Sequence, residues 1–472
     1  MSASRFVRGV FAALVLCGLL AVPAGAATFE PTRFDDPIPN GCKPRNCSLR
    51  EGILASNSRE GRDRVVLSKG TYEMELSIGG PSMSGSFDLV DGLLLVGEGR
   101  TNTKIDANGI DTVAECNLNL QPDDAYTLRG LTLTRGDAGP DPNSSAGGLN
   151  CGAEQGDKVR LENVGITHSS ASENGGGLQV GERATVTILD SRISDNEAFR
   201  GGGMILLPRA NGSVVTIRDS IITGNEAAFG GGIYSGADRL TIQRTTVSAN
   251  AGDEGGGMDL VASPDQQPVA DIRSSTISGN SARKGGGILA DGNQPGLGQQ
   301  KPVATLLNST VALNHTSADG GGIMADNAAT VTLDQATIAY NTADDDNVSG
   351  GVAGGVYQHS GAIFGLADSI VAENVVGASG TAAQCEGTFA GTAGGVVESQ
   401  PNGTCVVPGS FVTPDALIGT LADNGGPTET IRLLAGSPAV GSAHEGCPKK
   451  DQRGVKRPAD NCDSGAFERK GS

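Results

Sequence analysis

VVTIRDSIITGNEAAFGGGI, residues 214–233, holds the pattern that decides the fold. Val215 and Ile217 alternate with polar residues, Ile222 follows five positions later, Asn225 comes three residues after that, and a run of glycines follows. Apolar residues at every second position, rich in Val and Ile, predict short strands with one buried face. The constant five-residue step predicts two such strands joined by a tight bend, with Asn225 at a second bend.

The same pattern recurs in seven consecutive segments, and their length changes fall in loops such as Ser263–Pro268 and Asp291–Pro302. The Asn of each segment is Asn196, Asn225, Asn250, Asn280, Asn314, Asn341 or Asn374. Stacked Asn side chains can bond along a column, and Asn tolerates the left-handed backbone of a sharp bend. Glycines permit positive φ and close backbone approach where a third strand begins. A constant repeat with variable loops predicts a solenoid, and the Leu-x-x-Leu-x-Leu frame of the rival leucine-rich repeat is missing.

The repeat resembles that of the right-handed parallel β-helix superfamily, whose best-known members act on pectin. Its Asn-then-Gly-Gly-apolar rhythm is also similar to the polymorphic outer-membrane protein repeats of bacterial adhesins. The resemblance implies an all-β, pectin-lyase-like solenoid of roughly ten coils over residues 61–410. Weaker coils extend back through Leu128–Thr134 and Leu93–Lys104 to Val65–Tyr72.

Residues 1–26 have the features of a signal peptide. Arg5 and Arg8 precede a short apolar run, and small residues end at Ala26, so Ala27 is the expected first mature residue. The apolar run is too short for a membrane-spanning helix, and we expect no transmembrane segment. Cys17 offers a lipoprotein signal as the alternative to ordinary export. We expect a secreted or cell-surface protein.

Eight cysteines remain after such a cleavage, and an even number in an exported chain predicts disulfides. Metal binding is the competing interpretation, but Cys-x-x-Cys pairs are missing and His168, His315, His359 and His444 share no position in the repeat. Proximity in the sequence favours the pairs Cys42–Cys47, Cys116–Cys151, Cys385–Cys405 and Cys447–Cys462.

The charge balance restricts the partners. A formal net charge of −18 argues against nucleic acid and anionic lipid. A polyanionic glycan would need a local basic groove or bound cations. We expect an extracellular polysaccharide or surface glycan as the partner of a monomer.

Each end of the chain carries a more specific motif. Residues 47–53, Cys-Ser-Leu-Arg-Glu-Gly-Ile, resemble the Cys-Ser-Leu-Arg-Glu-Ala motif of bacterial exported β-helix proteins, with Gly52 in place of Ala. Residues 424–428, 436–439, 451–454 and 465–468 resemble the choice-of-anchor Q domain, although Val-Gly at 440–441 departs from the common Ile-Asp. That domain often precedes an anchoring tail; the last residues here, 469–472, hold none, so we expect release or non-covalent retention.

Both motifs also predict caps. Ser48 and Glu51 form a capping box, so a short helix from Leu49 to about Ser56 is expected to cover the first coil within residues 27–60. Residues 411–472, stapled by Cys447 and Cys462, are expected to seal the last coil. Asp451, Arg453 and Arg457 are interpreted as an internal ion-pair network of this cap.

A search for chemistry yields no catalytic, cofactor or metal site. A polygalacturonase-type hydrolase would need Asn-Thr-Asp, Asp-Asp, Gly-His-Gly and Arg-Ile-Lys elements; only the acidic run 344–346 is present, and it is interpreted as a solvated corner. Arg200, Glu254, Lys284 and Asp319 all precede the glycines and are expected to line one exposed face, together with Phe229 and Asn174.

Two functions follow. The first is a non-catalytic exported β-helix that acts in surface adhesion, envelope structure or glycan binding. The second is a polysaccharide lyase or glycoside hydrolase, which the fold alone supports.

Overall fold

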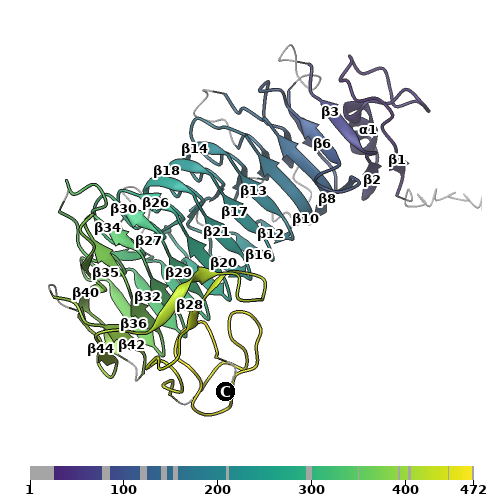
Figure 1. The fold of residues 1–472 in the computed structure, drawn as a ribbon. Coiled ribbons are helices and arrows are strands. Elements are labelled where there is room, and N and C mark those ends of the chain that lie inside the picture. Colours follow the sequence, from purple (N-terminus) through teal and green to yellow (C-terminus); the bar gives the residue numbers. More distant parts are fainter. Residues whose placement is uncertain are drawn as a thin grey trace, which may run out of the picture.

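The computed structural model describes residues 26–76, 85–116, 125–139, 146–151, 158–208, 212–293, 300–348, 350–391, 394–401, 405–444 and 446–469. The expected signal peptide, apart from Ala26, and Cys17 lie outside these residues. The chain winds into a right-handed parallel β-helix of about ten turns, which confirms the predicted fold (Figure 1).

A central coil contains four strands. In the coil quoted above they are β16 (Val214–Arg218), β17 (Ile221–Thr223), β18 (Glu226–Phe229) and β19 (Ile233–Ser235). The sequence predicts β16, β17 and β19. It does not predict β18, because the residues after the Asn show no apolar alternation.

Stacking of the coils gives three parallel sheets, and a two-stranded ribbon follows them. The long sheet carries the strand pairs before each Asn: β1 (Thr28–Phe29), β2 (Asp63–Val66), β3 (Gly70–Glu73), β5 (Leu93–Val96), β6 (Thr103–Asp106), β8 (Ala125–Thr134), β10 (Lys158–Thr167), β12 (Thr185–Leu189), β13 (Arg192–Ser194), β16, β17, β20 (Arg239–Gln243), β21 (Thr246–Ser248), β24 (Val269–Arg273), β25 (Thr276–Ser278), β28 (Val303–Leu307), β29 (Thr310–Ala312), β32 (Thr330–Asp334), β33 (Thr337–Ala339), β36 (Ile363–Ala367), β37 (Ile370–Ala372), β41 (Ala390–Gly391), β42 (Val396–Glu398) and β44 (Phe411–Thr413).

The strands after each Asn form the short sheet: β14 (Glu197–Arg200), β18, β22 (Ala251–Glu254), β26 (Ser281–Ala282), β30 (His315–Thr316), β34 (Thr342–Ala343), β38 (Val375–Val376) and β39 (Thr381–Ala382), the last of which pairs antiparallel with β38. The strands after the glycines form the middle sheet: β4 (Phe87–Leu89), β7 (Ala114–Cys116), β9 (Leu149–Cys151), β11 (Leu178–Val180), β15 (Met204–Leu206), β19, β23 (Met258–Val261), β27 (Ile288–Asp291), β31 (Ile323–Asp326), β35 (Val356–Gln358), β40 (Cys385–Thr388) and β43 (Cys405–Val406). The ribbon is β45 (Ile418–Ala422) with β46 (Thr430–Leu433).

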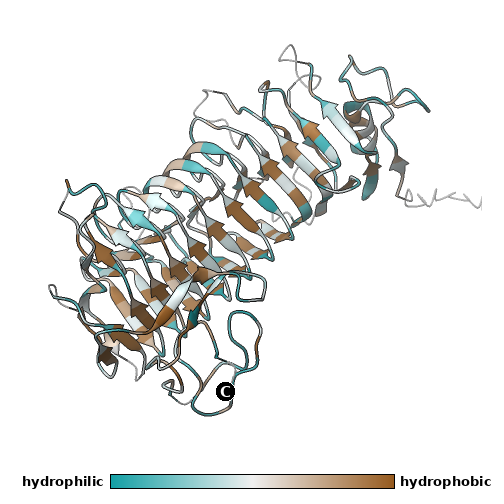
Figure 2. Cartoon of the chain, viewed as in Figure 1, coloured by the Kyte–Doolittle hydropathy of each residue, from teal (hydrophilic) through white to brown (hydrophobic). Residues whose placement is uncertain are grey.

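The inward residues of these sheets form one continuous core. Val215, Ile217 and Ile222 of the quoted coil are buried and stack on their counterparts in the coils before and after. Figure 2 shows the alternation as brown and pale bands along the long-sheet strands. The core therefore follows from the period-two pattern.

The Asn residues stack as predicted. The side-chain amide of Asn225 donates to the Asn250 carbonyl at 2.9 Å, and Asn250 donates to Asn280 at 2.9 Å. The series runs from Asn196 to Asn374, whose amide donates to Gln384. These Asn side chains are buried, so the ladder satisfies polar groups that solvent does not reach.

The left-handed backbone belongs to the residue before each Asn and not to the Asn, which corrects the sequence-based expectation. The residues with positive φ in this position are Asp195, Gly224, Ala249, Gly279, Leu313, Tyr340 and Glu373. The Asn itself turns its amide inward, where it donates to the next Asn and to a backbone carbonyl of the preceding coil, as Asn225 does to Ile193 O.

A second ladder, which the sequence analysis missed, runs through the bend within each strand pair. The Ser220 hydroxyl accepts from Ser191 N at 3.1 Å, and the Thr245 hydroxyl accepts from Ser220 N at 3.3 Å. Ser275 and Ser309 continue the column. Its signal in the sequence is the Ser or Thr five residues before six of the seven Asn residues; Ala336 stands in this position before Asn341.

The glycine run is needed for two reasons. Its first residue, such as Gly201, has φ near +64°, which favours glycine. A Cβ on its third residue, Gly203, would lie 2.5 Å from Gly232 O and 2.9 Å from the Asn225 amide. The Asn ladder and the glycines therefore depend on each other.

The N-terminal helix forms as predicted. Helix α1 (Leu49–Asn57) begins after Ser48, and Ser48 and Glu51 make the capping box. Leu49 and Ile53 pack into the core of the β-helix, which places α1 over the first coil (Figure 1). Among the described residues, α1 is far too short to cross a membrane, and no other segment forms a helix that could.

The C-terminal block, residues 414–469, lies along the flank of the long sheet. The Thr276 hydroxyl of β25 donates to Glu429 O, and the Thr310 hydroxyl of β29 donates to Gln452. Ala339 of β33 and Ile370 of β37 share an apolar cluster with the block. In Figure 1 this yellow segment runs beside the last third of the solenoid.

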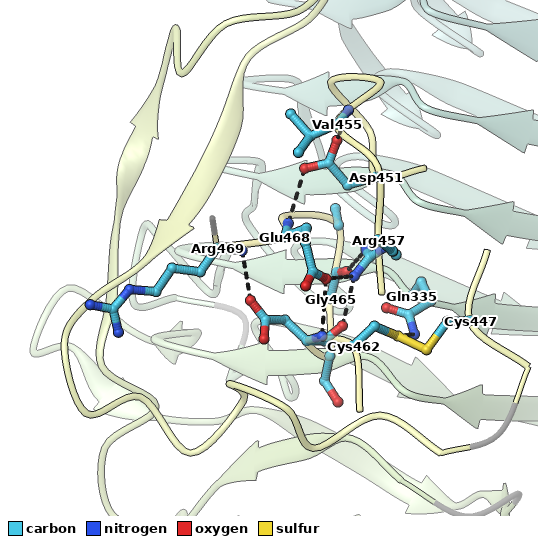
Figure 3. A network of polar contacts seen from close by, with 12 residues as sticks. Gln335, Cys447, Asp451, Val455, Arg457, Cys462, Gly465, Glu468 and Arg469 are labelled. Atoms are coloured by element: carbon cyan, nitrogen blue, oxygen red, sulfur yellow. Dashed lines mark hydrogen bonds and ion pairs between the residues drawn. A yellow bond between two sulfur atoms is a disulfide. The ribbon is translucent and has the colours of Figure 1, made fainter. Parts of the chain in front are cut away.

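A buried polar network holds the block together (Figure 3). Arg457 pairs with Glu468 at 2.8 Å, and Arg453 pairs with Asp451 at 2.7 Å. The network confirms the internal ion pairs that the sequence predicted, with Glu468 as the partner of Arg457. Asp451 also accepts from the backbone amide of Glu468.

Within the described residues, this block does not cover the last coil, contrary to the sequence-based expectation. Val412 of β44 continues the inward column of Val371 and Val397, yet it is 61% exposed. Phe411 and Val406, on the same coil, are also exposed. The block lies on the flank because its apolar residues pack against Ala312, Ile370 and their neighbours on the outer face of the long sheet.

The eight described cysteines form disulfides in sequential pairs. They are Cys42–Cys47, Cys116–Cys151, Cys385–Cys405 and Cys447–Cys462. The first lies in the N-terminal cap, the next two join consecutive coils of the middle sheet, and the last staples the C-terminal block (Figure 3).

Candidate functional site: a groove over the short sheet

A groove follows the axis of the β-helix over β14, β18 and β22. Two adjoining hollows of about 550 and 320 Å³ make it up, and both are lined by Glu197 and Ala198. Its floor carries the small residues Ala171, Ala198 and Ala227. The short-sheet strands pack closely against the glycine runs: a Cβ added to Gly231 would lie 2.2 Å from Ala251 O.

One wall of the groove is a column of polar side chains in register. Asp137, Ser170, Glu197 and Glu226 occupy equivalent positions on four successive coils. Neighbouring strands in a sheet lie about 4.8 Å apart, so the column repeats at that interval. It presents hydrogen-bond acceptors at regular steps along the axis.

The other wall carries an aromatic ring. Phe199 lines the groove and is 42% exposed. It meets Phe229 edge to face at 5.4 Å, and the Arg200 guanidinium lies over its ring at 4.9 Å. Arg200 is itself paired with Glu173 at 3.4 Å, so its charge is offset at this edge.

The predicted row before the glycines lies beside this wall. Asn174, Arg200, Phe229, Glu254 and Lys284 pair in register on successive strands, which confirms that they share one row. Glu254 accepts from Arg283 at 3.0 Å. The charged members of the row are of mixed sign, and Asn174 and Phe229 are uncharged. Asp319 also precedes its glycines and accepts from Val352 N.

Across the glycine turn, the outer face of the middle sheet holds titratable groups that the sequence analysis missed. Asp259 of β23 is fully buried, and neither carboxylate oxygen has a hydrogen-bond partner. Burial raises the pKa of Asp259 well above its usual range, and the carboxylates of Asp291 and Glu254 add to the effect. Burial likewise raises the pKa of Tyr234, its neighbour in register on β19.

The same face carries a second perturbed carboxyl nearer the N-terminus. Burial raises the pKa of Glu115 to about 7, and the carboxylates of Asp88 and Asp111 contribute. Asp88 is the register partner of Glu115 on β4, and it is exposed. General acid–base catalysis uses such an arrangement, in which one carboxyl has a pKa near neutral pH and two other carboxylates contribute to the shift.

The acidic run 344–346 is a corner, as predicted. Asp344 accepts from Gly350 N and Asp346 accepts from Val348 N, both within the turn. Asp345 accepts from His315 at 2.7 Å. The run therefore caps its own loop, and Asp344 is more buried than a solvated corner requires.

The four histidines lie apart. His315, His359 and His444 each contact a different carboxylate, and His168 contacts the neighbouring Thr167. Within the described part of the chain, three carboxylates come together elsewhere: oxygens of Glu373, Glu398 and Asp415 lie within 4.8 Å of one another. Oxygen ligands of this kind suit Ca²⁺, but Glu398 already accepts from the amides of Glu373 and Ala416.

The sequence does carry a signal of the groove. Ala or Gly stands two positions after five of the seven Asn residues, as in Ala198, Ala227, Gly252 and Ala282; Thr316 and Val376 are the exceptions. The wall residues precede this position, as Glu197 and Glu226 do. Because small residues show no apolar alternation, the sequence analysis predicted neither the short-sheet strands nor the groove above them.

Comparison with known proteins identifies the class of fold. A family model described as "Right handed beta helix region" matches residues 91–266, which include the three strands of the groove. The matched region contains neither of the two terminal motifs, which remain resemblances. No curated protein matches the chain.

Solved structures of similar fold act on polysaccharides. Pectate lyase Pel9A is 14% identical, with a TM-score of 0.47 and coverage of 94% of this chain and 98% of that one. A rhamnogalacturonan lyase is 11% identical, with a TM-score of 0.36 and coverage of 88% and 96%. The A-module of the mannuronan C-5 epimerase AlgE6 of Azotobacter vinelandii is 15% identical, with a TM-score of 0.32 and coverage of 78% and 94%. At these values the structures assign no activity to this chain.

Proposed function

We propose that this chain is an exported, non-catalytic β-helix protein that binds an extracellular glycan in the groove over β14, β18 and β22. The observation that carries the proposal is the groove itself: a continuous hollow along the axis, walled by acceptors at one-coil steps and by the exposed ring of Phe199. Carboxylates and hydroxyls accept from sugar hydroxyl groups, and an aromatic ring packs on the apolar face of a sugar.

Export supports this function. Four disulfides are typical of an oxidising compartment. We propose that residues 1–26 are removed as a signal peptide and that the mature protein is secreted or held at the cell surface, with a role in surface adhesion or envelope structure. The remaining proposed units are the N-terminal cap (27–60), the β-helix (61–410) and a C-terminal unit (411–472), most of which lies on the flank of the long sheet.

The test combines binding and cleavage on one panel of acidic, neutral and amino polysaccharides, with and without calcium. We expect retention in affinity electrophoresis on at least one of them, and neither unsaturated products nor new reducing ends. Ala227→Trp, which fills the groove floor, should abolish retention. Ile363→Trp, on the exposed outer face of β36, is the matched control and should retain binding. Equal retention by both variants would contradict the groove as the site.

A glycoside hydrolase is the second candidate, and Glu115 is the observation that favours it. A carboxyl whose pKa is raised to about 7 is protonated over much of the neutral range and can serve as a general acid. The neighbouring Asp88 would then be the base. Cleavage of any panel member would support this function, and Glu115→Gln should abolish that cleavage without loss of retention. Its rate should fall as the pH rises through about 7, because the acid then loses its proton.

A further inference from the structure

The charges that line the groove are all of one sign. Among its described lining residues, Asp137, Glu197, Glu226 and Asp253 are acidic and none is basic. Two guanidinium groups of this region are not among the lining residues and have partners: Arg200 pairs with Glu173, and Arg283 pairs with Glu254 at 3.0 Å. The groove therefore offers an unbalanced negative potential within a chain whose net charge is −18.

Such a lining selects against one class of glycan and for another. A polyuronate would bring a carboxylate beside Glu197 and Glu226, and like charges at this separation repel. A neutral glycan would gain hydrogen bonds alone. A glycan with amino groups would gain charge-assisted hydrogen bonds to the same carboxylates, which are about twice as strong as neutral ones.

We infer that the groove binds an amine-bearing glycan, such as a polymer of glucosamine units, with the polymer axis parallel to the β-helix axis. This inference rests on the proposed function of glycan binding and names the ligand class of that site. The register supports it, because Glu197 and Glu226 repeat at one-coil steps and can meet amino groups on an extended chain. Phe199 on the opposite wall provides the surface for packing on a sugar ring.

The experiment compares two hexamers with the same sugar backbone: the glucosamine hexamer, whose amines are free and charged, and its fully N-acetylated form, in which neutral amides replace them. Binding to the full chain is measured by calorimetry in mildly acidic buffer, where the free amines are protonated and ordinary carboxylates are ionised. We expect the free amine to bind at least about tenfold more tightly at low salt, and the ratio to shrink as salt rises. A galacturonate hexamer should not bind.

Variants connect the preference to the groove. Glu226→Gln should weaken binding of the free amine about threefold to tenfold and leave the acetylated form unchanged. Asp265→Asn removes the same charge from an exposed loop outside the groove and should change neither. A pentalysine peptide is a further arm, and equal affinity for it would mean that charge alone is recognised and would overturn the glycan class.

The outcomes separate the two proposals. Equal or tighter binding of the acetylated or galacturonate hexamer would overturn the inference and leave glycan binding standing. If no glycan of the panel or hexamer binds, the proposed function fails, and the inference fails with it. A preference for the amine that Glu226→Gln does not reduce would place it outside this groove and overturn the inference as well.

Discussion

Asp259 shows how one residue of this solenoid departs from the pattern around it. Its counterparts in register are Tyr234 and Leu289, so a buried carboxyl stands in a row of large side chains. With both oxygens unpartnered and Asp291 and Glu254 nearby, the ionised form is strongly disfavoured. The residue is compatible with the fold in its protonated form.

The raised pKa of Asp259 makes the stability of the protein depend on pH. Because the pKa of Asp259 is higher in the folded protein than in the unfolded chain, its contribution is fully present below the unfolded pKa of ~3.9. It is lost as the pH rises from there towards the folded-state pKa. We predict that Asp259→Asn matches the parent in melting temperature at acid pH and exceeds it increasingly towards neutral pH. Asp265→Asn, which is exposed, should show no such trend; a pH-independent difference for Asp259→Asn would contradict the account.

At the scale of the element, the Asn ladder is the feature that joins the coils at the second bend. The Asn280 carbonyl oxygen accepts from both the side-chain amide and the backbone amide of Asn250, and its own amide donates to Asn314. Removal of one side chain therefore leaves several buried polar groups without partners. Neighbouring coils feel the loss, because stability in a solenoid depends on interfaces between repeats.

We predict that Asn280→Ala lowers the free energy of unfolding by about 3 kcal/mol, since each buried group left unsatisfied costs about 1–3 kcal/mol. Asn293→Ala, at an exposed loop position, should cost less than about 0.5 kcal/mol. Chemical denaturation of both variants checks the difference. Equal effects would mean that the ladder adds nothing to the stability.

The sequence predicted those parts of the architecture in which the packing of a residue leaves a regular pattern. Val215 and Ile217 face a core, so their spacing reveals the strand, and Asn225 recurs because its amide has one place to bond. The short sheet packs its backbone against glycines, so Ala227 and its neighbours leave no apolar period to detect. The Ser and Thr ladder was hidden because such residues are common at turns of any kind.

The candidate site was less predictable than the fold. The row with Arg200 and Lys284 was found because it is fixed by its distance from the glycines. Glu115 and Asp259 could not be singled out, because their burial depends on neighbouring coils that lie about thirty residues away in the chain. The predicted position of the C-terminal block was also wrong. Its motif indicates a terminal unit but does not predict which surface of the solenoid that unit covers.

At the scale of the whole molecule, the two ends of the solenoid differ. Helix α1 covers the first coil with Leu49 and Ile53, whereas the C-terminal block lies on the flank and leaves Val412 open to solvent. An inward-facing side chain of the last coil therefore contributes less to the free energy of unfolding than the equivalent side chain of an earlier coil.

A pair of matched substitutions tests this asymmetry. Val371→Thr buries a hydroxyl in the closed part of the column and should cost about 2 kcal/mol of unfolding free energy. Val412→Thr, two strands along the same column, should cost less than about 0.5 kcal/mol because solvent reaches the side chain. Similar losses for both, measured by denaturation, would mean that the last coil is covered in solution.

The central claim is that the groove over β14, β18 and β22 is the ligand site, and the absence of tryptophan from the chain allows a direct test. Phe199→Trp places the chain's single tryptophan in the groove wall, and Ile363→Trp places it on the outer face of β36. Titration with the glucosamine hexamer should shift the emission of the first variant and protect it from a soluble quencher, and should leave the second unchanged. Binding that is detected by calorimetry but leaves the Trp at position 199 unaffected would contradict the account.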